Sequence, residues 1–303
     1  MSNKEYLVAL YAFSDFGPAR TNLLLSYFKS AKNVWNATFN ELLEVGIRKT
    51  TVEKFILYRN NFNFIKYFER LKKLNIGYLV KSDKDYPENL KELDSAPLVL
   101  YYRGKLSKND GNAVAIVGSR KMTSYGKDVT EKFSGELAAY GLTIVSGLAR
   151  GVDTVAHWGA LNAGGRTVAV IASGLDRIYP PENNGLVLEI IKRGGVIFSE
   201  YPLGYPPLPV NFPLRNRIIS GLSKVILVIE GAKKSGTLLT ASHAADQGKT
   251  VFAIPGQITS LYSEAPLFLL QNGAKLATCV KDILDELNLQ VKVDRDAVSD
   301  ILP

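Results

Sequence analysis

The chain has 303 residues, of which 46% are hydrophobic and 22% charged, a composition typical of a globular protein with one large domain or two unequal ones. It has no apolar run long enough to cross a bilayer and no N-terminal secretory signal, and Cys279 is its only cysteine. These features exclude an internal disulfide, argue against a membrane protein and favour a cytoplasmic location. The net charge of +8 favours a polyanionic partner, although many soluble proteins are mildly basic.

Residues 1–75 predict a small helical domain, because apolar residues recur there at helical spacing. Two turns, at residues 16–20 and 44–49, place a glycine between hydrophobic residues and join pairs of helical segments. Turns of this kind occur in helix-hairpin-helix modules, in which the amides of the second helix face a phosphate. The alternative is a helical bundle whose glycines only end helices, and the sequence leaves both interpretations open.

Residues 76–111 predict two strands, IGYLV and PLVLYYRG, and from residue 112 strands and helices alternate regularly. The six apolar strand candidates in this part are AVAIVG, LTIVSG, TVAVIA, GVIFSE, KVILVIE and TVFAIP. The helices between and after them are expected at 124–140, 152–163, 182–193, 213–222, 237–248 and 264–272. Strands that are apolar throughout are buried on both faces, so we expect an α/β fold with a mostly parallel sheet and helices on both sides.

Ligands of such sheets bind at the carboxyl ends of the strands, and small polar residues follow all six strands here. Arg120 and Lys121 follow the first strand, Arg150 the second, and Lys233 and Lys234 the fifth. Residues 1–110 hold 18 basic and 12 acidic residues, whereas the remainder holds 19 and 17, so an anion site on the sheet depends on a few well-placed cations. The alternative is that loops after strands are rich in Gly and Ser in any α/β sheet.

Two arginines, Arg215 and Arg217, flank Asn216 at the start of an expected helix. The helix dipole disfavours cations at that end, and a bound anion would offset the cost. The alternative is an internal ion-pair network with carboxylates such as Glu200 or Glu230.

The sequence predicts neither a metal nor a cofactor. Asp153 and His157 share a helix face, but the chain has only two histidines and no cysteine cluster, so packing or hydrogen bonding is the preferred role for this pair. The G-x-x-x-x-G-K-[ST], G-x-G-x-x-G and G-x-S-x-G motifs are absent, which disfavours nucleotide hydrolysis, dinucleotide binding and serine-hydrolase chemistry.

Several long motifs resemble those of the DNA-processing protein A (DprA/Smf) family, in the same order, over residues 80–285. They are VGSR, SGLARGVDTVAHWGAL, GLDRIYPPEN, SEYP, NFPLRNRIISGLS, SGTLLTA and VFAIPG. The resemblance implies an extended Rossmann-like core that binds single-stranded DNA without catalysis. It also implies loading of the RecA recombinase during natural transformation, and a homodimer, whose interface we expect around residues 255–285.

The resemblance further implies a domain organisation and a site. Residues 1–75 resemble the SAM-like or helix-hairpin-helix domain of the family, residues 76–287 form the DNA-binding domain, and residues 288–303 form a linker or tail in which the family's C-terminal winged helix is not found. Together with the strand-end pattern, it predicts a nucleic-acid site with no catalytic or metal-binding residue. Its members are Gly118, Ser119, Arg120, Lys121, Ser146, Gly147, Arg150, Arg215, Asn216, Arg217, Lys233, Lys234, Ser235, Gly236 and Thr237.

The sequence departs from the family at three places. Pro181 and Pro209 stand where some relatives carry basic residues, a loss for which Lys233 and Lys234 are the candidate substitutes, and SEAPLFLLQNGAKL lacks the usual Gly and Asn. A mononucleotide phosphoribohydrolase of similar layout is the alternative function, although residues 234–239 lack the paired glycines and the glutamate of that family. A scaffold without a nucleic-acid role is the third hypothesis. Aromatic candidates for stacking on bases are Tyr125, Tyr179, Tyr201, Tyr205 and Phe212.

Overall fold

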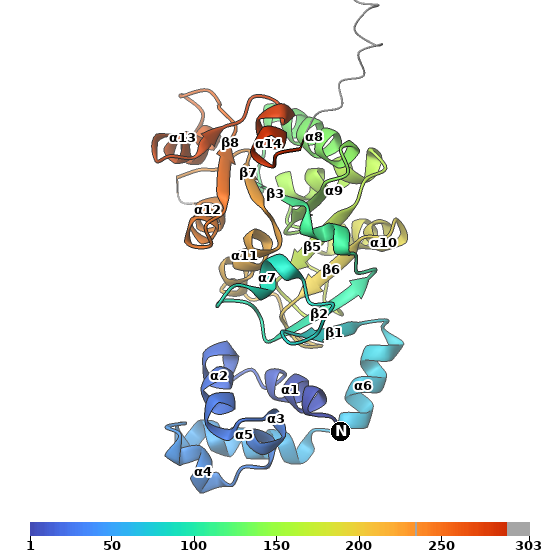
Figure 1. Cartoon of the computed structure of the whole chain (residues 1–303), viewed down its shortest axis with the longest axis vertical. Coiled ribbons are helices and arrows are strands. Elements are labelled where there is room, and N and C mark those ends of the chain that lie inside the picture. Colours follow the sequence, from blue (N-terminus) through green and yellow to red (C-terminus); the bar gives the residue numbers. More distant parts are fainter. Residues whose placement is uncertain (234, 290–303) are drawn as a thin grey trace, which may run out of the picture.

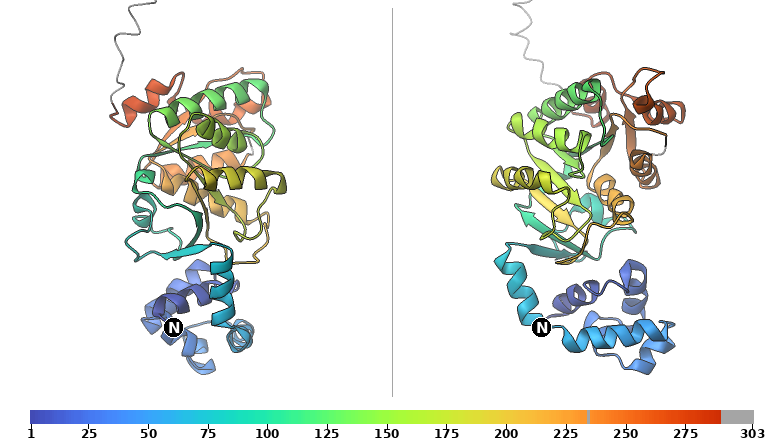
Figure 2. Two further views of the ribbon diagram at one scale, coloured as in Figure 1. Left: turned by 90° about the vertical axis from the view of Figure 1, so that its right-hand side faces the viewer. Right: turned by 180° about the vertical axis from the view of Figure 1, so that it is seen from behind.

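The computed structural model describes residues 1–233 and 235–289. Lys234 and residues 290–303, which make up most of the expected tail, lie outside the described residues. The chain begins with a helical region that lies beyond the sheet at one end of the molecule (Figures 1 and 2). Its helices are α1 (Asn3–Tyr11), α2 (Gly17–Phe28), α3 (Ala31–Asn36), α4 (Phe39–Glu44), α5 (Lys49–Asn61) and α6 (Phe64–Lys73).

The helices before α6 share a hydrophobic core of their own, rich in aromatic rings. Phe13, Phe16, Trp35 and Phe55 are buried together, with ring centroids 4.7 to 5.8 Å apart. The helix starts are set locally, since Ser2 forms a capping box with Glu5 and Thr38 forms one with Glu41.

The rest of the fold is built on one sheet of nine strands in the order β1-β2-β6-β5-β4-β3-β7-β8-β9 (Figure 1). The strands are β1 (Gly77–Val80), β2 (Val99–Gly104), β3 (Ala113–Val117), β4 (Thr143–Ser146), β5 (Thr167–Ile171), β6 (Val196–Ser199), β7 (Val225–Val228), β8 (Thr250–Ala253) and β9 (Lys275–Leu276). From β6 to β9 every pairing is parallel, whereas β2 pairs antiparallel with both β6 and β1.

Helices cover both faces of this sheet (Figure 2). The segments other than strands are α7 (Glu88–Lys91), η1 (Lys108–Gly111), α8 (Ser124–Ala139), α9 (Val152–Asn162), η2 (Pro181–Asn183), α10 (Asn184–Lys192), α11 (Asn211–Leu222), α12 (Gly236–Asp246), η3 (Leu261–Ser263), α13 (Glu264–Gln271) and α14 (Val280–Glu286). In β3, Val114 and Ile116 face a core shared with α8, α9 and α14. Ala113, Ala115 and Val117 face the opposite core, shared with α7, α11 and α12.

The expected α/β class and the mostly parallel sheet with helices on both faces are therefore confirmed. All eight predicted strands are present, and the six predicted helices after residue 112 agree with α8 to α13 within a few residues. α7, β9 and α14 were not predicted. β9 has only two residues, both exposed, so it has no apolar pattern. The domain boundaries at residues 75 and 287 stay a prediction.

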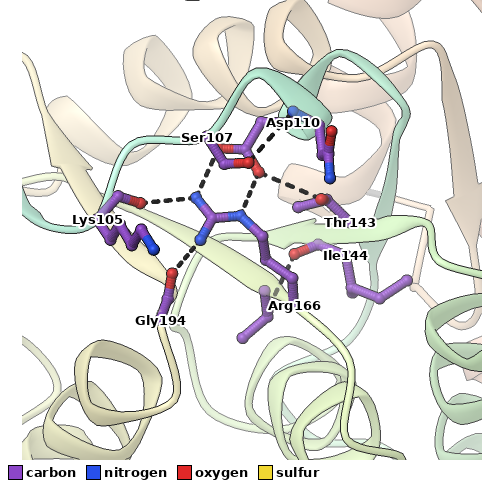
Figure 3. A network of polar contacts seen from close by, with 9 residues as sticks. Lys105, Ser107, Asp110, Thr143, Ile144, Arg166 and Gly194 are labelled. Atoms are coloured by element: carbon purple, nitrogen blue, oxygen red, sulfur yellow. Dashed lines mark hydrogen bonds and ion pairs between the residues drawn. The ribbon is translucent and has the colours of Figure 1, made fainter.

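At the amino ends of the strands, Arg166 joins four segments in one polar network (Figure 3). Its Nε donates to Asp110 Oδ1 at 2.5 Å and its Nη2 donates to the Lys105 carbonyl at 2.8 Å, while its Nη1 donates to the carbonyl of Gly194. Thr143 donates to the same Asp110 oxygen at 3.2 Å. The network holds the starts of β4, β5 and β6 at the edge opposite the predicted site.

The helical region is attached to the sheet by packing and by side-chain contacts. Val8 and Leu71 enter the hydrophobic core over β1, β2 and β6. Tyr11 donates to Glu200 at 2.5 Å in a buried position, and Arg70 pairs with Asp176 at 2.7 Å. These contacts connect α1 and α6 to the loops after β6 and β5. Across the described residues, no helix combines the length and the apolarity needed to span a membrane.

Candidate nucleic-acid interface

The order of the parallel strands reverses between β3 and β7, and ligands of open α/β sheets bind near such a point. Here, however, a carboxylate of the chain itself occupies the start of α8. Glu230, which follows β7, accepts from the Thr123 amide at 2.9 Å and from the Thr123 hydroxyl at 2.5 Å. A side chain at Gly126 would collide with this carboxylate. The N-terminus of α8 is thus already supplied with an anion.

Groups of the chain itself also occupy the start of α9. Asp153 accepts from the Ala149 amide at 3.3 Å, and the Val152 amide donates to the Ser119 carbonyl at 3.1 Å. Burial raises the pKa of Asp153, an effect opposed by the charge of Arg215. Groups of the chain itself therefore occupy the starts of both α8 and α9. Among residues 1–233 and 235–289, no side chain caps α11 or α12, and neither helix has an acidic residue in its first turn.

Beside this switch point, a small hollow of about 10 Å³ lies at the carboxyl ends of β3, β4 and β5, and we call it the strand-end groove. It is lined by Arg120, Gly147, Ala149, Arg150, Ala172, Tyr179, Pro180 and Phe212. Buried Gly147 and Ala172 lie in its floor, and the exposed side chains of Arg120 and Arg150 lie at its rim. Of these residues the sequence singled out Arg120, Gly147 and Arg150 for the site and Tyr179 and Phe212 for stacking, whereas Ala149, Ala172 and Pro180 were missed as site residues.

The groove contains a row of two adjacent aromatic rings with a cation at each end. The guanidinium of Arg120 lies 5.0 Å from the ring centroid of Phe212, and that of Arg150 lies 5.9 Å from the ring centroid of Tyr179. The two rings meet edge to face, with centroids 5.7 Å apart. Cation–π contacts of this kind hold planar groups in place. The row therefore offers both positive charge and aromatic faces, the two features that single-stranded nucleic acid needs.

Arg150 also pairs with the exposed carboxylate of Glu182 on η2. The hydrogen bond that Arg150 donates to Glu182 raises the pKa of Arg150 and lowers the pKa of Glu182. Glu182 was not among the predicted site residues, although it lies in the quoted motif GLDRIYPPEN. Its negative charge faces the same rim and competes with any anionic ligand for Arg150.

The loop from Gly118 to Lys121 is shaped by its neighbour, the turn before α9. Ser119 accepts from the Lys121 amide at 3.0 Å, and Gly151, at φ 75°, packs against the Ser119 carbonyl so closely that a side chain there would collide with it. A side chain at Gly118 would meet Val152. The glycines therefore let two loops approach each other, which leaves Arg120 and Lys121 exposed at the surface.

Arg215 lies beneath the groove rather than on it. It is 3% exposed and donates to the carbonyl of Gly147 at 2.5 Å and to that of Val170. Burial lowers its pKa to about 10, so it stays charged at neutral pH. A direct contact of Arg215 with an anion, as the sequence predicted, does not fit this buried position. Arg215 instead supports the floor of the groove.

Arg217 points away from the groove and pairs with Glu200 at 2.6 Å, and both side chains are largely buried. Glu200 also accepts from Tyr11 of α1. This arrangement is the internal ion-pair alternative considered for Arg217. Helical periodicity explains why Arg215 and Arg217 have different partners, because residues two positions apart lie on different faces of a helix.

The remaining predicted residues that the structure describes lie outside the lining of this groove. Ser146 is buried and donates to the Ile116 carbonyl at 2.6 Å, so its role is internal. Asn216 donates to the Gly236 carbonyl at 3.3 Å and thus joins α11 to the start of α12. At that start Thr237 is buried, whereas Gly236 and Lys233 are exposed. The Ser235 hydroxyl has no hydrogen-bond partner within residues 1–233 and 235–289. Lys234 lies outside the described residues.

Asp153 and His157 lie in the core and not at a cleft. His157 is fully buried, with Nδ1 2.7 Å from the Thr167 hydroxyl, and burial lowers its pKa to about 3. Since Thr167 donates to the Ile144 carbonyl, His157 Nδ1 carries the proton in this contact. The described residues contain no group of three or more His, Cys, Asp and Glu side chains suited to a metal ion.

The family follows from comparison with known proteins. Residues 77–288 match the family model described as DNA recombination-mediator protein A. The chain belongs to this family. Protein Smf of Synechocystis is 40% identical over the whole chain, which spans 78% of the length of that relative.

Two solved structures of family members have the same fold. DNA processing protein A of Streptococcus pneumoniae is 34% identical, with a TM-score of 0.78 over 94% of this chain and 98% of its own. DNA processing protein A of Helicobacter pylori is 32% identical, with a TM-score of 0.63 over 70% of this chain and 95% of its own. The Helicobacter pylori structure was reported for its single-stranded DNA binding mode. A protein of this fold with a reported single-stranded DNA binding mode is therefore among the relatives of this chain.

Proposed function

We propose that this protein binds single-stranded DNA along the groove at the carboxyl ends of β3, β4 and β5, and that it does so without catalysis. The observation that carries the proposal is the row Arg120–Phe212–Tyr179–Arg150, in which two guanidinium groups flank two aromatic rings. Guanidinium groups bind phosphates with several donors, and aromatic faces stack on any base. The uncapped first turns of α11 and α12 add backbone amides near the same edge.

The alternative function, hydrolysis of a mononucleotide, has less support. Glu230 and Asp153 occupy the starts of α8 and α9, where a small nucleotide would place its phosphate. An exposed row of cations and rings suits a polymer that passes across the surface. Release of free base from a mononucleotide by the purified protein would overturn this ranking.

The test is a salt titration of oligothymidylate binding, followed by fluorescence anisotropy, for the parent and for Arg120→Ala. The affinity of the parent should fall steeply with salt. Arg120→Ala should bind about tenfold more weakly at low salt, with a salt slope shallower by about 0.7, the value for one phosphate contact on a single strand. Lys132→Ala, which removes an exposed lysine on α8, is the control and should bind like the parent. Equal binding by Arg120→Ala would refute the site.

The protein also forms a homodimer in this proposal. Ile258 is 88% exposed and Leu261 is 68% exposed, and Phe268 and Leu276 add further exposed apolar surface near the outer strand β9. Self-association covers apolar surface of this kind. In sedimentation velocity, the double variant Ile258→Glu/Leu261→Glu should be a monomer, whereas Leu188→Glu, a matched change at an exposed leucine on α10, should stay dimeric. A dimeric double variant would place the interface elsewhere.

The bound strand is then passed to the RecA recombinase, the step that the resemblance to recombination mediators implies. Two grooves in one dimer would hold a single strand with higher avidity than one groove. On single-stranded DNA coated with a single-strand-binding protein, the parent should shorten the lag of RecA ATPase activity, and Arg120→Ala should do so far less. If the parent does not shorten the lag, the proposed loading step is wrong, whereas the proposed DNA binding is unaffected.

A further inference from the structure

A second hollow, of about 540 Å³, lies between α5 and α6 in the helical region. It is lined by Lys54, Leu57, Tyr58, Asn61, Phe62, Asn63, Lys66, Tyr67 and Arg70. Its volume is within the range of sites that hold small organic groups. Leu57 is 66% exposed there, although it is a large apolar side chain. The α5–α6 groove is therefore an open surface that the fold of the helical region leaves uncovered.

The lining combines three cations with three aromatic rings. Lys54, Lys66 and Arg70 are exposed, while the rings of Tyr58, Phe62 and Tyr67 are half-buried. Asn61 and Asn63 add amide groups, and no described residue of the lining is acidic. This is the composition of surfaces that stack on bases and neutralise phosphates.

Two of the three cations of the groove remain accessible to an anion. Lys54 pairs with Asp15 at 3.0 Å, and the two side chains are 67% and 34% exposed, so this pair is of the weak, solvent-exposed kind. Arg70 pairs at 2.7 Å with Asp176, whose side chain is only 9% exposed, so Arg70 stays with its carboxylate. Lys66 has no carboxylate partner among residues 1–233 and 235–289.

The α5–α6 groove is also connected to the strand-end groove. Arg70, at the edge of the α5–α6 groove, pairs with Asp176. Asp176 lies three residues before Tyr179 and accepts from the Gly204 amide at 2.8 Å. Tyr67 packs into the same hydrophobic core as Ile178, the residue before Tyr179. The loop that carries Tyr179 therefore contacts α6, the helix that forms one side of the α5–α6 groove.

We propose that the α5–α6 groove is a second contact for the same DNA strand that occupies the strand-end groove. This inference rests on the proposed function. It assigns to the helical region a role in lengthening the DNA site: Lys54 and Lys66 contact phosphates, and bases pack against Phe62 and Tyr67. The positive charge of the lining favours a nucleic acid over a protein segment that has few acidic residues.

The test compares a short oligothymidylate of about 6 nucleotides with one of about 30, since single sites for single strands cover roughly 4 to 16 nucleotides. The variant is Lys54→Glu/Lys66→Glu. Its matched control, Lys32→Glu/Lys72→Glu, makes the same charge change at two exposed lysines of the helical region outside the groove lining. The variant should bind the short oligonucleotide like the parent and the long one about tenfold more weakly, with a salt slope shallower by about 1.4, the value for two phosphate contacts. The control should bind both like the parent.

A second measurement maps the contact directly. An oligonucleotide of about 30 nucleotides containing 4-thiothymidine is crosslinked to the parent protein by light, and peptides that cover α5 and α6 should carry the crosslink. Unchanged binding of the long oligonucleotide by the variant, or an equal loss on both oligonucleotides, would overturn the second contact. Failure of the parent to bind either oligonucleotide would instead overturn the proposed function.

Discussion

The guanidinium of Arg120, on the loop after β3, lies 5.0 Å from the ring centroid of Phe212, in the first turn of α11. The contact joins the loop that leaves the first parallel strand to the helix that precedes β7. It holds a flexible, exposed cation against a ring, so less conformational freedom is lost when a phosphate binds. The same ring meets Tyr179 edge to face, which makes Phe212 the centre of the groove.

Phe212→Ala should therefore weaken oligothymidylate binding by about 1 to 3 kcal/mol, the usual loss for one stacking ring. Phe212→Tyr should retain most of the affinity, because it preserves the aromatic face. The measurement is fluorescence anisotropy at constant salt. Tyr140→Ala, which removes a 48% exposed ring at the end of α8, is the matched control. Equal losses for Phe212→Ala and Tyr140→Ala would show that the groove has no special role.

Glu182→Gln should strengthen binding about two- to threefold at low salt, because it removes the negative charge that pairs with Arg150 at the rim. The gain should disappear at high salt, where exposed charges are screened. Glu189→Gln on α10 removes the same charge from pairs with Lys192 and Arg193 and should have little effect. An unchanged or lower affinity for Glu182→Gln would mean that Arg150 does not contact DNA.

Arg166→Ala should lower the free energy of unfolding by about 3 kcal/mol, because it leaves a largely buried Asp110 carboxylate without its partner. Arg166→Lys should recover only part of this loss, since one ammonium cannot reach Asp110 and two carbonyls in the same planar geometry. Urea unfolding measures both. The folded fraction should still bind DNA like the parent, and a specific loss of binding would contradict a purely structural role.

Tyr11→Phe should lower stability by about 1 to 2 kcal/mol, because it removes a buried hydrogen bond to the charged Glu200. The chain has two tryptophans, Trp35 in the helical region and Trp158 on α9. In a Trp158→Phe background, the fluorescence of Trp35 reports unfolding of the helical region alone. Tyr11→Phe should shift this transition to lower urea more than Tyr58→Phe, which loses a bond to a neutral carbonyl. An equal shift would show that Glu200 is not what makes Tyr11 important.

His157 should make the protein less stable as the pH falls below 6.5. Burial lowers the pKa of His157 from 6.5 to about 3, so between these values the unfolded chain binds a proton that the folded protein excludes. The free energy of unfolding should therefore decrease by about 1.4 kcal/mol for each pH unit in this range. Above pH 6.5 this contribution is constant.

The check is urea unfolding at about pH 7 and about pH 5.5, a window above the usual carboxyl range. The parent should lose about 1 kcal/mol between the two values. His157→Asn, which keeps a donor for Thr167 and has no titrating group, should lose much less even if it is less stable at both. A parent with the same stability at both pH values would contradict the account of His157.

Much of the fold was predictable because it depends on local patterns. The apolar runs from AVAIVG to TVFAIP could bury both faces only as parallel strands, and the helices between them followed from periodicity. The position of Arg120 at the end of the first of these strands was predictable for the same reason. Tyr179 and Phe212 were candidates among five aromatic residues, but their sequence positions contain no information about which rings meet.

The amino-acid sequence by itself determined the α/β class, the strand-end location of the cations and the membership in a recombination-mediator family. Only the tertiary structure decided which of those cations face outward. Arg215 and Arg217 are two residues apart, yet one lies under Gly147 and the other meets Glu200, because α11 presents them to different neighbours. Likewise, Glu230 reaches the start of α8 only because β7 lies beside β3. Charges separated by a hundred residues interact through space, and the pairing of strands sets that distance.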